Sequence, residues 1–131
     1  MPHALTDRFV HLDALGGAHV LPAFSGDMRW YAEYGRLHPD DGAAGRLVSV
    51  HEFAESWSSW EMHPLGSEVV ACLSGVIDLI RERADGGIER ERLGPGDYGI
   101  NPPGSWHTAD VVEPARVLFI TAGEGTQHRP R

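Results

Sequence analysis

The stretch that decides the fold is GDYGINPPGSWH, residues 96–107. Two prolines followed by a glycine are a turn signal, and this turn delivers His107 onto the extended segment that comes next. Glycine and proline punctuate the whole chain in a similar way, with 16 glycines and 9 prolines among 131 residues. Short apolar segments between such breaks are typical of an all-β domain built from many short strands.

A second stretch that carries chemistry is WEMHPLGSE, residues 60–68. Residues two apart on a strand project to the same face about 6.5 Å apart, so Glu61 and His63 can both point toward one atom. The Pro-Leu-Gly turn that follows leads into another strand, whose first residue, Glu68, comes back alongside His63. This arrangement predicts a metal site. Cys72 lies about 13 Å further along the strand, so we do not expect it to bind the same ion.

The remaining strands are predicted from apolar segments between turn signals. Residues 84–87, ADGG, tolerate the positive φ angles of a tight hairpin turn, so the strands on either side should pair antiparallel. One short helix is predicted at residues 27–34. The predicted strands are residues 46–53, 67–73, 76–82, 88–93, 98–101, 106–111 and 115–122. This spacing favours a sandwich or a barrel-like jelly roll.

The composition excludes several kinds of chemistry and partner. With 11 basic and 19 acidic residues the formal charge is -8, so neither nucleic acid nor an anionic membrane is expected as a partner. All the basic residues are arginines, which removes lysine-based catalysis. Cys72 is the single cysteine and cannot form an intramolecular disulfide. Residues 1–20 hold no signal-peptide core, and no apolar run is long enough to cross a membrane, so a cytoplasmic location is expected.

Together, the two histidine-bearing stretches resemble the two sequence motifs of the cupins. In that family the second motif runs Gly, five residues, Pro-x-Gly, two residues, His. The first runs Gly, five residues, His-x-His, three or four residues, Glu, six residues, Gly. The second motif is matched completely by Gly96, Pro102, Gly104 and His107. The first motif is matched in its second half by His63, Glu68 and Gly75.

The resemblance implies a small single-domain cupin, an all-β, double-stranded jelly-roll β-barrel with one divalent metal ion near its centre. We place the barrel core at residues 46–122, between an N-terminal extension at residues 1–45 and a C-terminal tail at residues 123–131. A homodimer is expected, in which the N-terminal extension or an edge strand covers the exposed sheet.

Departures from the cupin pattern concern the metal site. Glu61 stands where most metal-binding cupins have the first histidine, and Glu55 replaces the upstream glycine. A carboxylate binds Zn, Fe, Ni or Mn about as naturally as imidazole does, so the identity of the ion stays open. In the cupin-like mannose phosphate isomerases an oxygen-bearing side chain occupies that first position and the metal is zinc. The predicted metal ligands are His63, Glu68 and His107, with Glu61 as the fourth ligand or as the catalytic acid or base.

Two functional hypotheses from different classes follow. A site of two histidines and one or two carboxylates is similar to that of non-haem iron oxygenases. This favours a metal-dependent enzyme acting on a small organic molecule, with dioxygenase or other oxidoreductase chemistry ahead of isomerase or lyase chemistry. The alternative is a non-catalytic module that binds a small molecule or a metal, such as a sensor. Bound iron with O₂ consumption would support dioxygenase or other oxidoreductase chemistry. Bound zinc or nickel without O₂ consumption would support isomerase or lyase chemistry.

Burial without a metal is the competing interpretation of the site. His63 and His107 could be core histidines satisfied by hydrogen bonds to Glu68 and Glu61, as in cupins that have lost their metal. Burying two carboxylates in a small barrel without a cation or a proton would be very costly, which favours the metal.

A substrate pocket is expected beside the metal. His51 lies on the strand before the first motif, and Trp57 shares the alternation of the side chains that face the metal. Phe119 is assigned to the pocket by analogy with the last strand of cupins. The same alternation points Trp60 and Trp106 away from the metal.

Charged side chains outside these stretches are interpreted as solvated surface. The arginine-rich segment at residues 81–92 alternates with acidic residues, which indicates a solvated hairpin with ion pairs and not an anion site. The histidines interpreted in this way are His3, His11, His19, His38 and His128.

Overall fold

The computed structural model describes residues 2–39 and 41–131, which form mainly β-strands. Helix α1 (Met28–Leu37) begins after Asp27, whose side chain accepts the backbone N–H of Arg29. The described strands are β1 (Val10–Leu12), β2 (Ala18–Val20), β3 (Arg46–Phe53), β4 (Ser59–Met62), β5 (Glu68–Glu82), β6 (Ile88–Leu93), β7 (Tyr98–Asn101), β8 (His107–Thr121) and β9 (Gln127–Pro130). A short 3-10 helix, η1 (Gly42–Ala44), precedes β3. None of the helices in the described ranges has the length and apolar character needed to cross a membrane.

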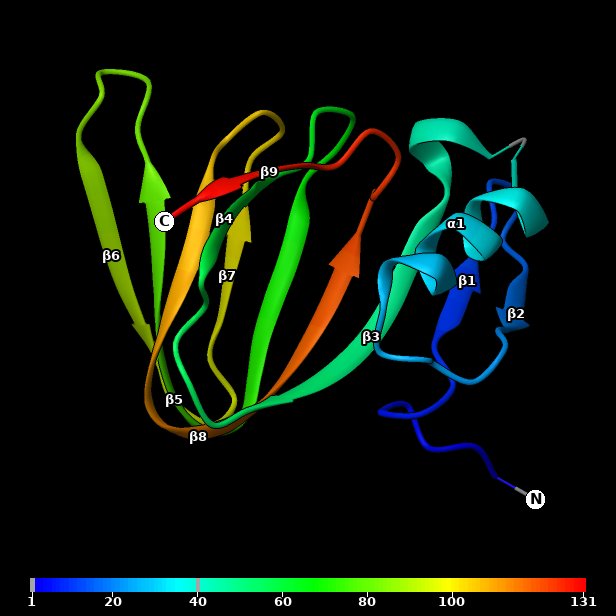
Figure 1. Ribbon diagram of the computed structural model, residues 1–131, viewed down its shortest axis with the longest axis horizontal. Coiled ribbons are helices and arrows are strands. Elements are labelled where there is room, and N and C mark those ends of the chain that lie inside the picture. Colours follow the sequence, from blue (N-terminus) through cyan, green and yellow to red (C-terminus); the bar gives the residue numbers. More distant parts are fainter. Residues whose placement is uncertain (1, 40) are drawn as a thin grey trace.

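The long strands β5 and β8 bend in the middle, and each contributes to two facing sheets (Figure 1). The first half of β5 pairs with the second half of β8, and this sheet has the order β2-β1-β3-β8-β5-β7. The other halves pair in a second sheet of order β9-β4-β8-β5-β6. Because all these pairs are antiparallel and the two sheets share their central strands, the architecture is a jelly-roll barrel.

The bend in β5 has a local cause at Gly75. The register between β5 and β8 shifts between Cys72 and Ile77, which marks a β-bulge. Gly75 has a φ of 75°, and a Cβ there would lie 2.1 Å from the carbonyl oxygen of Pro114, so only glycine fits. The prediction of separate strands at residues 67–73 and 76–82 was therefore wrong, because the bulge redirects the strand without ending its pairing.

The boundaries of several other strands and of the helix can be compared with those predicted from local sequence patterns. The predictions of strands at residues 46–53, 88–93 and 98–101 are confirmed by β3, β6 and β7, and the antiparallel hairpin of β5 and β6 is confirmed as well. The predicted helix is α1, which begins one residue later and ends three residues later than expected. The strands predicted at residues 106–111 and 115–122 are one strand, β8, which follows the same bend as β5.

The apolar core fills the bent end of the barrel and leaves the opposite end to polar residues. Val70 pairs with Phe119 and Cys72 pairs with Val117, and all four side chains are buried between the sheets. The other core residues are Ile77, Leu79, Leu93 and Ala115. One step further along the same strands, Glu68 begins the polar end.

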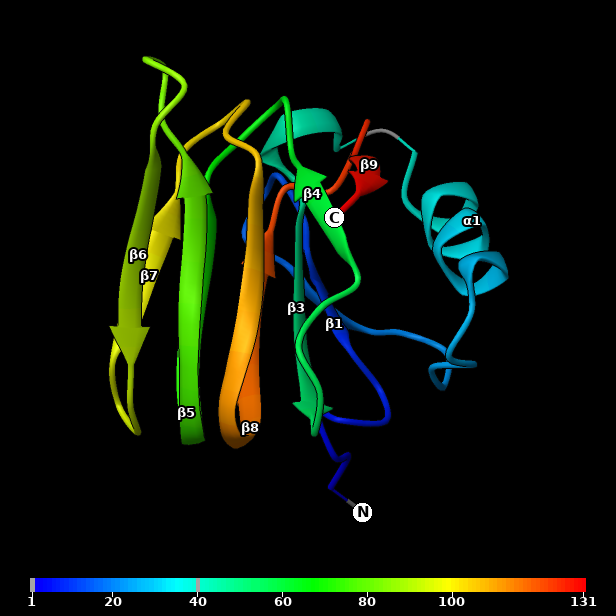
Figure 2. The same cartoon turned by 60° about the vertical axis from the view of Figure 1, so that its left-hand side comes forward.

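A smaller apolar cluster holds the N-terminal segment onto the edge of the first sheet. Phe9 and Trp30 are buried, and their rings meet edge to face with centroids 5.2 Å apart. Leu21 and Leu47 complete this cluster. In both views α1 lies at the end of the molecule opposite β6 (Figures 1 and 2).

Candidate metal centre

Glu68 is held by hydrogen bonds from both neighbouring strands. It pairs with Asn101 of β7 on one side and with Thr121 of β8 on the other, so the three side chains share the inner face of the first sheet. The Asn101 amide donates to Oε1 of Glu68 at 3.1 Å, and the Thr121 hydroxyl donates to Oε2 at 2.7 Å. The Glu68 carboxylate is buried, and these donors fix its position.

The facing sheet carries a second polar row. His107 of β8 pairs with Glu61 of β4 on one side and with Arg81 of β5 on the other, and Glu61 also pairs with His128 of β9. Since cross-strand partners share a face, these four side chains all point toward the first sheet. His63, which follows β4, completes the set.

Four side chains converge where the two rows meet, and we refer to them as the barrel centre: Glu61, His63, Glu68 and His107. Nε2 of His63 lies 3.1 Å from Oε2 of Glu68, and Nε2 of His107 lies 3.2 Å from Oε1 of the same carboxylate. Oε2 of Glu61 is further away, at 3.9 Å and 4.0 Å from the two Nε2 atoms. Side chains predicted from two separate motifs are thus brought together.

The hydrogen-bond partners of the two rings show where their lone pairs point. Nδ1 of His107 donates to the carbonyl oxygen of Ser105 at 3.1 Å. The hydroxyl of Thr126 uses its hydrogen on the carbonyl oxygen of Gly123, so it accepts from Nδ1 of His63 at 2.7 Å. With Nδ1 as the donor in both neutral rings, both Nε2 lone pairs face the Glu68 carboxylate.

This arrangement leaves an electrostatic problem that a cation would solve. Among the described residues, Nε2 of His63 and Nε2 of His107 are buried side-chain nitrogens without a hydrogen-bond partner, since their short approaches to Glu68 lack hydrogen-bond geometry. Buried polar atoms are rarely left in this state. Two imidazole lone pairs and a carboxylate aimed at one point require a proton or a metal ion between them.

The charges of the barrel centre shift its ionisation equilibria. Burial opposes ionisation of Glu68, but its contacts with His107 and His63 hold the pKa of the carboxyl group well below its ordinary value. Burial lowers the pKa of His63, but the contact with Glu68 and its charge outweigh this, and the pKa is raised overall. The carboxylate therefore stays negative and favours a positive charge on or beside His63.

The donor set fits a divalent transition metal. Ligand atoms that are each about 2.0–2.2 Å from one ion lie about 3.0–3.4 Å apart, which matches the distances between Glu68 and the two imidazoles. Ligand atoms of Glu61, His63 and His107 also lie within 4.8 Å of one another. Glu68 is outside that group of three, but it approaches both rings more closely than Glu61 does. Imidazole and carboxylate together suit Zn, Fe, Ni and Mn.

Arg81 corrects the interpretation of residues 81–92 as a solvated hairpin. Its side chain is buried, and Nε donates to the amide oxygen of Asn101 at 2.8 Å, while Nη2 donates to Glu91 at 2.9 Å. Because Arg81 takes the oxygen of the Asn101 amide, the NH₂ group must face Glu68. The strand pattern did not reveal this inward arginine, since it lies at the far end of β5 and reaches Asn101 only after the strand bends.

A cavity of about 1030 Å³ opens beside the barrel centre and reaches the N-terminal segment. Its lining includes His51, Trp57 and Phe119, which were expected in a pocket, together with Glu61, His63 and Glu68. Trp60 and Trp106 lie elsewhere, and the Arg129 guanidinium stacks on both rings, 5.3 Å and 4.5 Å from their centroids.

Two histidines interpreted as surface residues have other surroundings. His11 is buried, with 2% of its surface exposed, because β1 joins the first sheet and α1 covers it, so its interpretation as a solvated side chain was wrong. His128 is half exposed, but its Nε2 lies 3.4 Å from Oε1 of Glu61. No local pattern indicates this contact, because it depends on the pairing of β9 with β4.

Comparisons with known proteins identify the fold. No protein-family model matches the sequence, and no curated protein matches it. An uncharacterised conserved protein with a double-stranded β-helix domain, from Klebsiella pneumoniae, aligns over 66% of this chain and 76% of its own with a TM-score of 0.53 and 22% identity. The chain has the cupin fold. The cupin resemblance and the all-β jelly roll expected from the sequence are thereby confirmed.

Two enzymes share the fold of this chain at low identity. Oxalate decarboxylase from Bacillus subtilis, a protein with Mn(II) centres, aligns with a TM-score of 0.54 and 18% identity over 65% of this chain and 23% of its own. Hydroquinone 1,2-dioxygenase from Sphingomonas, with 4-hydroxybenzoate bound, aligns with a TM-score of 0.50 and 18% identity over 58% of this chain and 59% of its own. This chain therefore spans less than two thirds of either enzyme.

Proposed function

We propose that this cupin is a divalent-metal-dependent enzyme that acts on a small organic molecule in the cavity beside the barrel centre. His63, His107 and Glu68 would hold the ion, and Glu61 would handle protons at the cavity side or serve as a fourth ligand. The observation that carries the proposal is the pair of buried Nε2 atoms that face the Glu68 carboxylate without hydrogen-bond partners. When bound, a divalent ion would polarise oxygen atoms of the substrate and, if it is iron, also support reaction with O₂.

The residues that line the cavity favour an organic substrate that contains a planar apolar group. Aromatic side chains from three separate segments line the cavity: Tyr31, Phe53, Trp57 and Phe119. Such rings bind planar apolar groups by stacking and by edge-to-face contact. The polar side chains of Glu61 and His128 lie on the same lining and can bind hydroxyl or carboxylate groups.

Glu61 is placed to move a proton. Its side chain is 29% exposed, in contrast to the buried Glu68, and it faces the cavity. One oxygen lies toward the two imidazoles and the other is 3.4 Å from Nε2 of His128, whose side chain is 44% exposed. A proton taken by Glu61 from a substrate hydroxyl can therefore pass to His128 and on to solvent.

Dioxygenase or other oxidoreductase chemistry is the favoured reaction class. Two histidines and a carboxylate are the ligand set of non-haem iron oxygenases. The fold is shared with a hydroquinone dioxygenase that has a hydroxybenzoate bound, which is consistent with an aromatic substrate here. Isomerase or lyase chemistry with zinc, nickel or manganese is the competing reaction class.

The test is reconstitution of the untagged protein with Fe²⁺, Mn²⁺, Zn²⁺ or Ni²⁺, followed by metal analysis and turnover assays with a panel of small phenols and carboxylic acids. We expect that His63 and His107 are required for the binding of one ion per chain, whatever other ions the chain binds, and that the iron form consumes O₂ with a phenolic substrate. The proposal would be overturned if none of the four metals binds, or if their binding does not depend on His63 and His107. Saturable ligand binding without turnover in any metal form would favour a binding module.

A further inference from the structure

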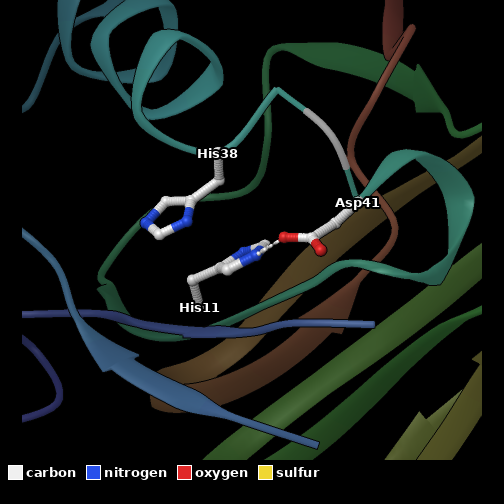
Figure 3. Close-up of side chains that lie close together, drawn as sticks. All are labelled: His11, His38 and Asp41. Carbon is white, nitrogen blue, oxygen red and sulfur yellow. Dashed lines mark hydrogen bonds and ion pairs between the residues drawn. The ribbon is translucent and has the colours of Figure 1, made fainter. Parts of the chain in front are cut away.

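A second group of metal-ligating side chains lies outside the barrel centre. His11 of β1, His38 at the end of α1, and Asp41 come together at the N-terminal end of the molecule (Figure 3). Each offers a ligand atom, and these atoms lie within 4.8 Å of one another. We refer to these three residues as the N-terminal cluster.

The N-terminal cluster places two imidazoles near one carboxylate. Nε2 of His11 is hydrogen-bonded to Oδ2 of Asp41 at 2.5 Å, so an ion bound here would replace this hydrogen bond and move the two atoms slightly apart. The His38 ring stacks on the His11 ring, with centroids 4.0 Å apart and an angle of 24° between the planes (Figure 3). A histidine–aspartate pair that only links β1 to the connection after α1 needs a single imidazole. The second imidazole near the same carboxylate therefore needs another explanation.

The surrounding residues hold His11 as they would hold a metal ligand. Its Nδ1 lies 2.6 Å from the hydroxyl oxygen of Tyr34, which leaves Nε2 as the atom that faces Asp41. Metal-bound histidines commonly use their second nitrogen in this way. Oδ1 of Asp41 accepts the backbone N–H of Ala14 at 3.2 Å. A Cβ at Gly45 would lie 3.0 Å from Cε1 of His11 and 2.8 Å from Cβ of Asp41, so the close approach depends on this glycine.

The N-terminal cluster and the barrel centre share a face of the first sheet but are separate. His11 pairs with Leu47, Leu47 with Thr121, and Thr121 with Glu68, so the His11 and Glu68 backbones are three strands apart in one row. Three strand spacings correspond to about 14 Å, too far for one ion to reach both groups. Both groups line the same cavity.

We propose that His11, His38 and Asp41 bind a second divalent cation of the zinc, nickel, cobalt or iron type. Two imidazoles and one carboxylate suit these ions, and the cavity leaves room for water or a ligand at the remaining coordination positions. The neighbouring pair of His19 and Asp13 is not part of the ligand set. Asp13 already accepts the backbone N–H groups of Leu15 and Gly17 and contacts His19 at 2.6 Å.

The test counts ions in untagged, demetallated protein titrated with Co²⁺ against a chromophoric chelator. We expect two ions per chain in the wild type, and one in each of the variants His38→Asn and Asp41→Asn. Both substitutions fall in a partly exposed connection, so the fold should be retained, which far-ultraviolet circular dichroism checks. The exposed His3→Asn variant is the matched control and should keep both ions.

Variants of the barrel centre separate this proposal from the proposed function. The double variant His63→Ala/His107→Ala should retain one ion, and that ion should disappear when His38→Asn is added. Retention of one ion in this double variant but none in the triple variant would support the N-terminal cluster whether or not the protein is an enzyme. The proposal is overturned if His38→Asn and Asp41→Asn, folded as the wild type, bind as many Co²⁺ ions as the wild type does.

Discussion

The barrel centre and the N-terminal cluster use the same kinds of donor in different backbone settings. In the barrel centre, Glu68 and His107 lie on paired strands, and neighbouring side chains hold the carboxylate from both sides. In the N-terminal cluster only His11 lies on a strand, while His38 and Asp41 belong to the connection between α1 and η1. Ordering a connection costs conformational entropy that paired strands have already lost. The barrel centre should therefore bind its ion more tightly.

The largest effect is expected from removal of the buried carboxylate. Glu68→Ala should lower the free energy of unfolding by about 3 kcal/mol, because two imidazoles, Asn101 and Thr121 lose their partner in the interior. It should also abolish ion binding at the barrel centre and leave the N-terminal cluster loaded. Urea denaturation and metal analysis measure the two effects.

The matched control for Glu68 is an exposed glutamate. Glu52 pairs with Arg116 on the surface, and Glu52→Ala should change the free energy of unfolding by less than about 1 kcal/mol. Equal destabilisation by the two substitutions would contradict the assignment of Glu68 as the residue that organises the barrel centre.

Glu61→Gln separates proton transfer from metal binding. If Glu61 handles protons, the variant should keep its barrel ion and lose roughly 10²-fold or more in kcat, since the amide cannot accept a proton. Glu55→Gln, at an exposed residue on the same cavity lining, should leave kcat unchanged. Loss of the barrel ion from Glu61→Gln would instead make Glu61 a metal ligand.

Gly45→Ala tests the N-terminal cluster without removing a ligand. The added methyl group would meet the His11 ring and Asp41, and we expect about tenfold weaker binding of the second ion with an unchanged barrel ion. Gly35→Ala on α1 is the control, because a Cβ there meets nothing within 4 Å. Isothermal titration with Zn²⁺ gives both affinities. Equal second-ion affinity in the two variants would argue against the role of Gly45.

The pH dependence should differ modestly between the two sites. The pKa of His63 is raised overall because Glu68 outweighs burial, whereas the pKa of His38 is lowered by burial and by the neighbouring His11 and His19. A metal needs a neutral imidazole, and affinity begins to fall once the pH drops below the pKa of the ligand. The affinity of the barrel centre should therefore begin to fall at higher pH than that of the N-terminal cluster, and the reverse order in a Co²⁺ titration at several pH values would contradict this.

Much of the fold was predictable from local patterns. The alternation in β3 and the turn between β5 and β6 involve residues within a few positions of one another, and both predictions were confirmed. The division of β5 into two strands failed because Gly75 looks like a break in the sequence but acts as a bulge in a paired strand. The predicted homodimer stays a prediction.

The candidate site was only partly predictable, for a related reason. Glu61, His63 and Glu68 lie close together in the chain, so their convergence follows from strand alternation and one turn. The contact of His128 with Glu61 depends on the pairing of β9 with β4 across more than sixty positions of sequence. The burial of His11 depends on the packing of α1 over β1, which no local pattern records.

The sequence by itself determined the positions of most strands in the barrel core, the turns and the donors that two motifs supply, because these depend on short-range alternation and turn chemistry. Only the tertiary structure decided how those donors face one another. The bend at Gly75 brings Arg81, from one end of β5, onto Asn101 beside Glu68 at the other end. Such contacts depend on the register between distant strands, which the packing of the whole core sets and no single segment encodes.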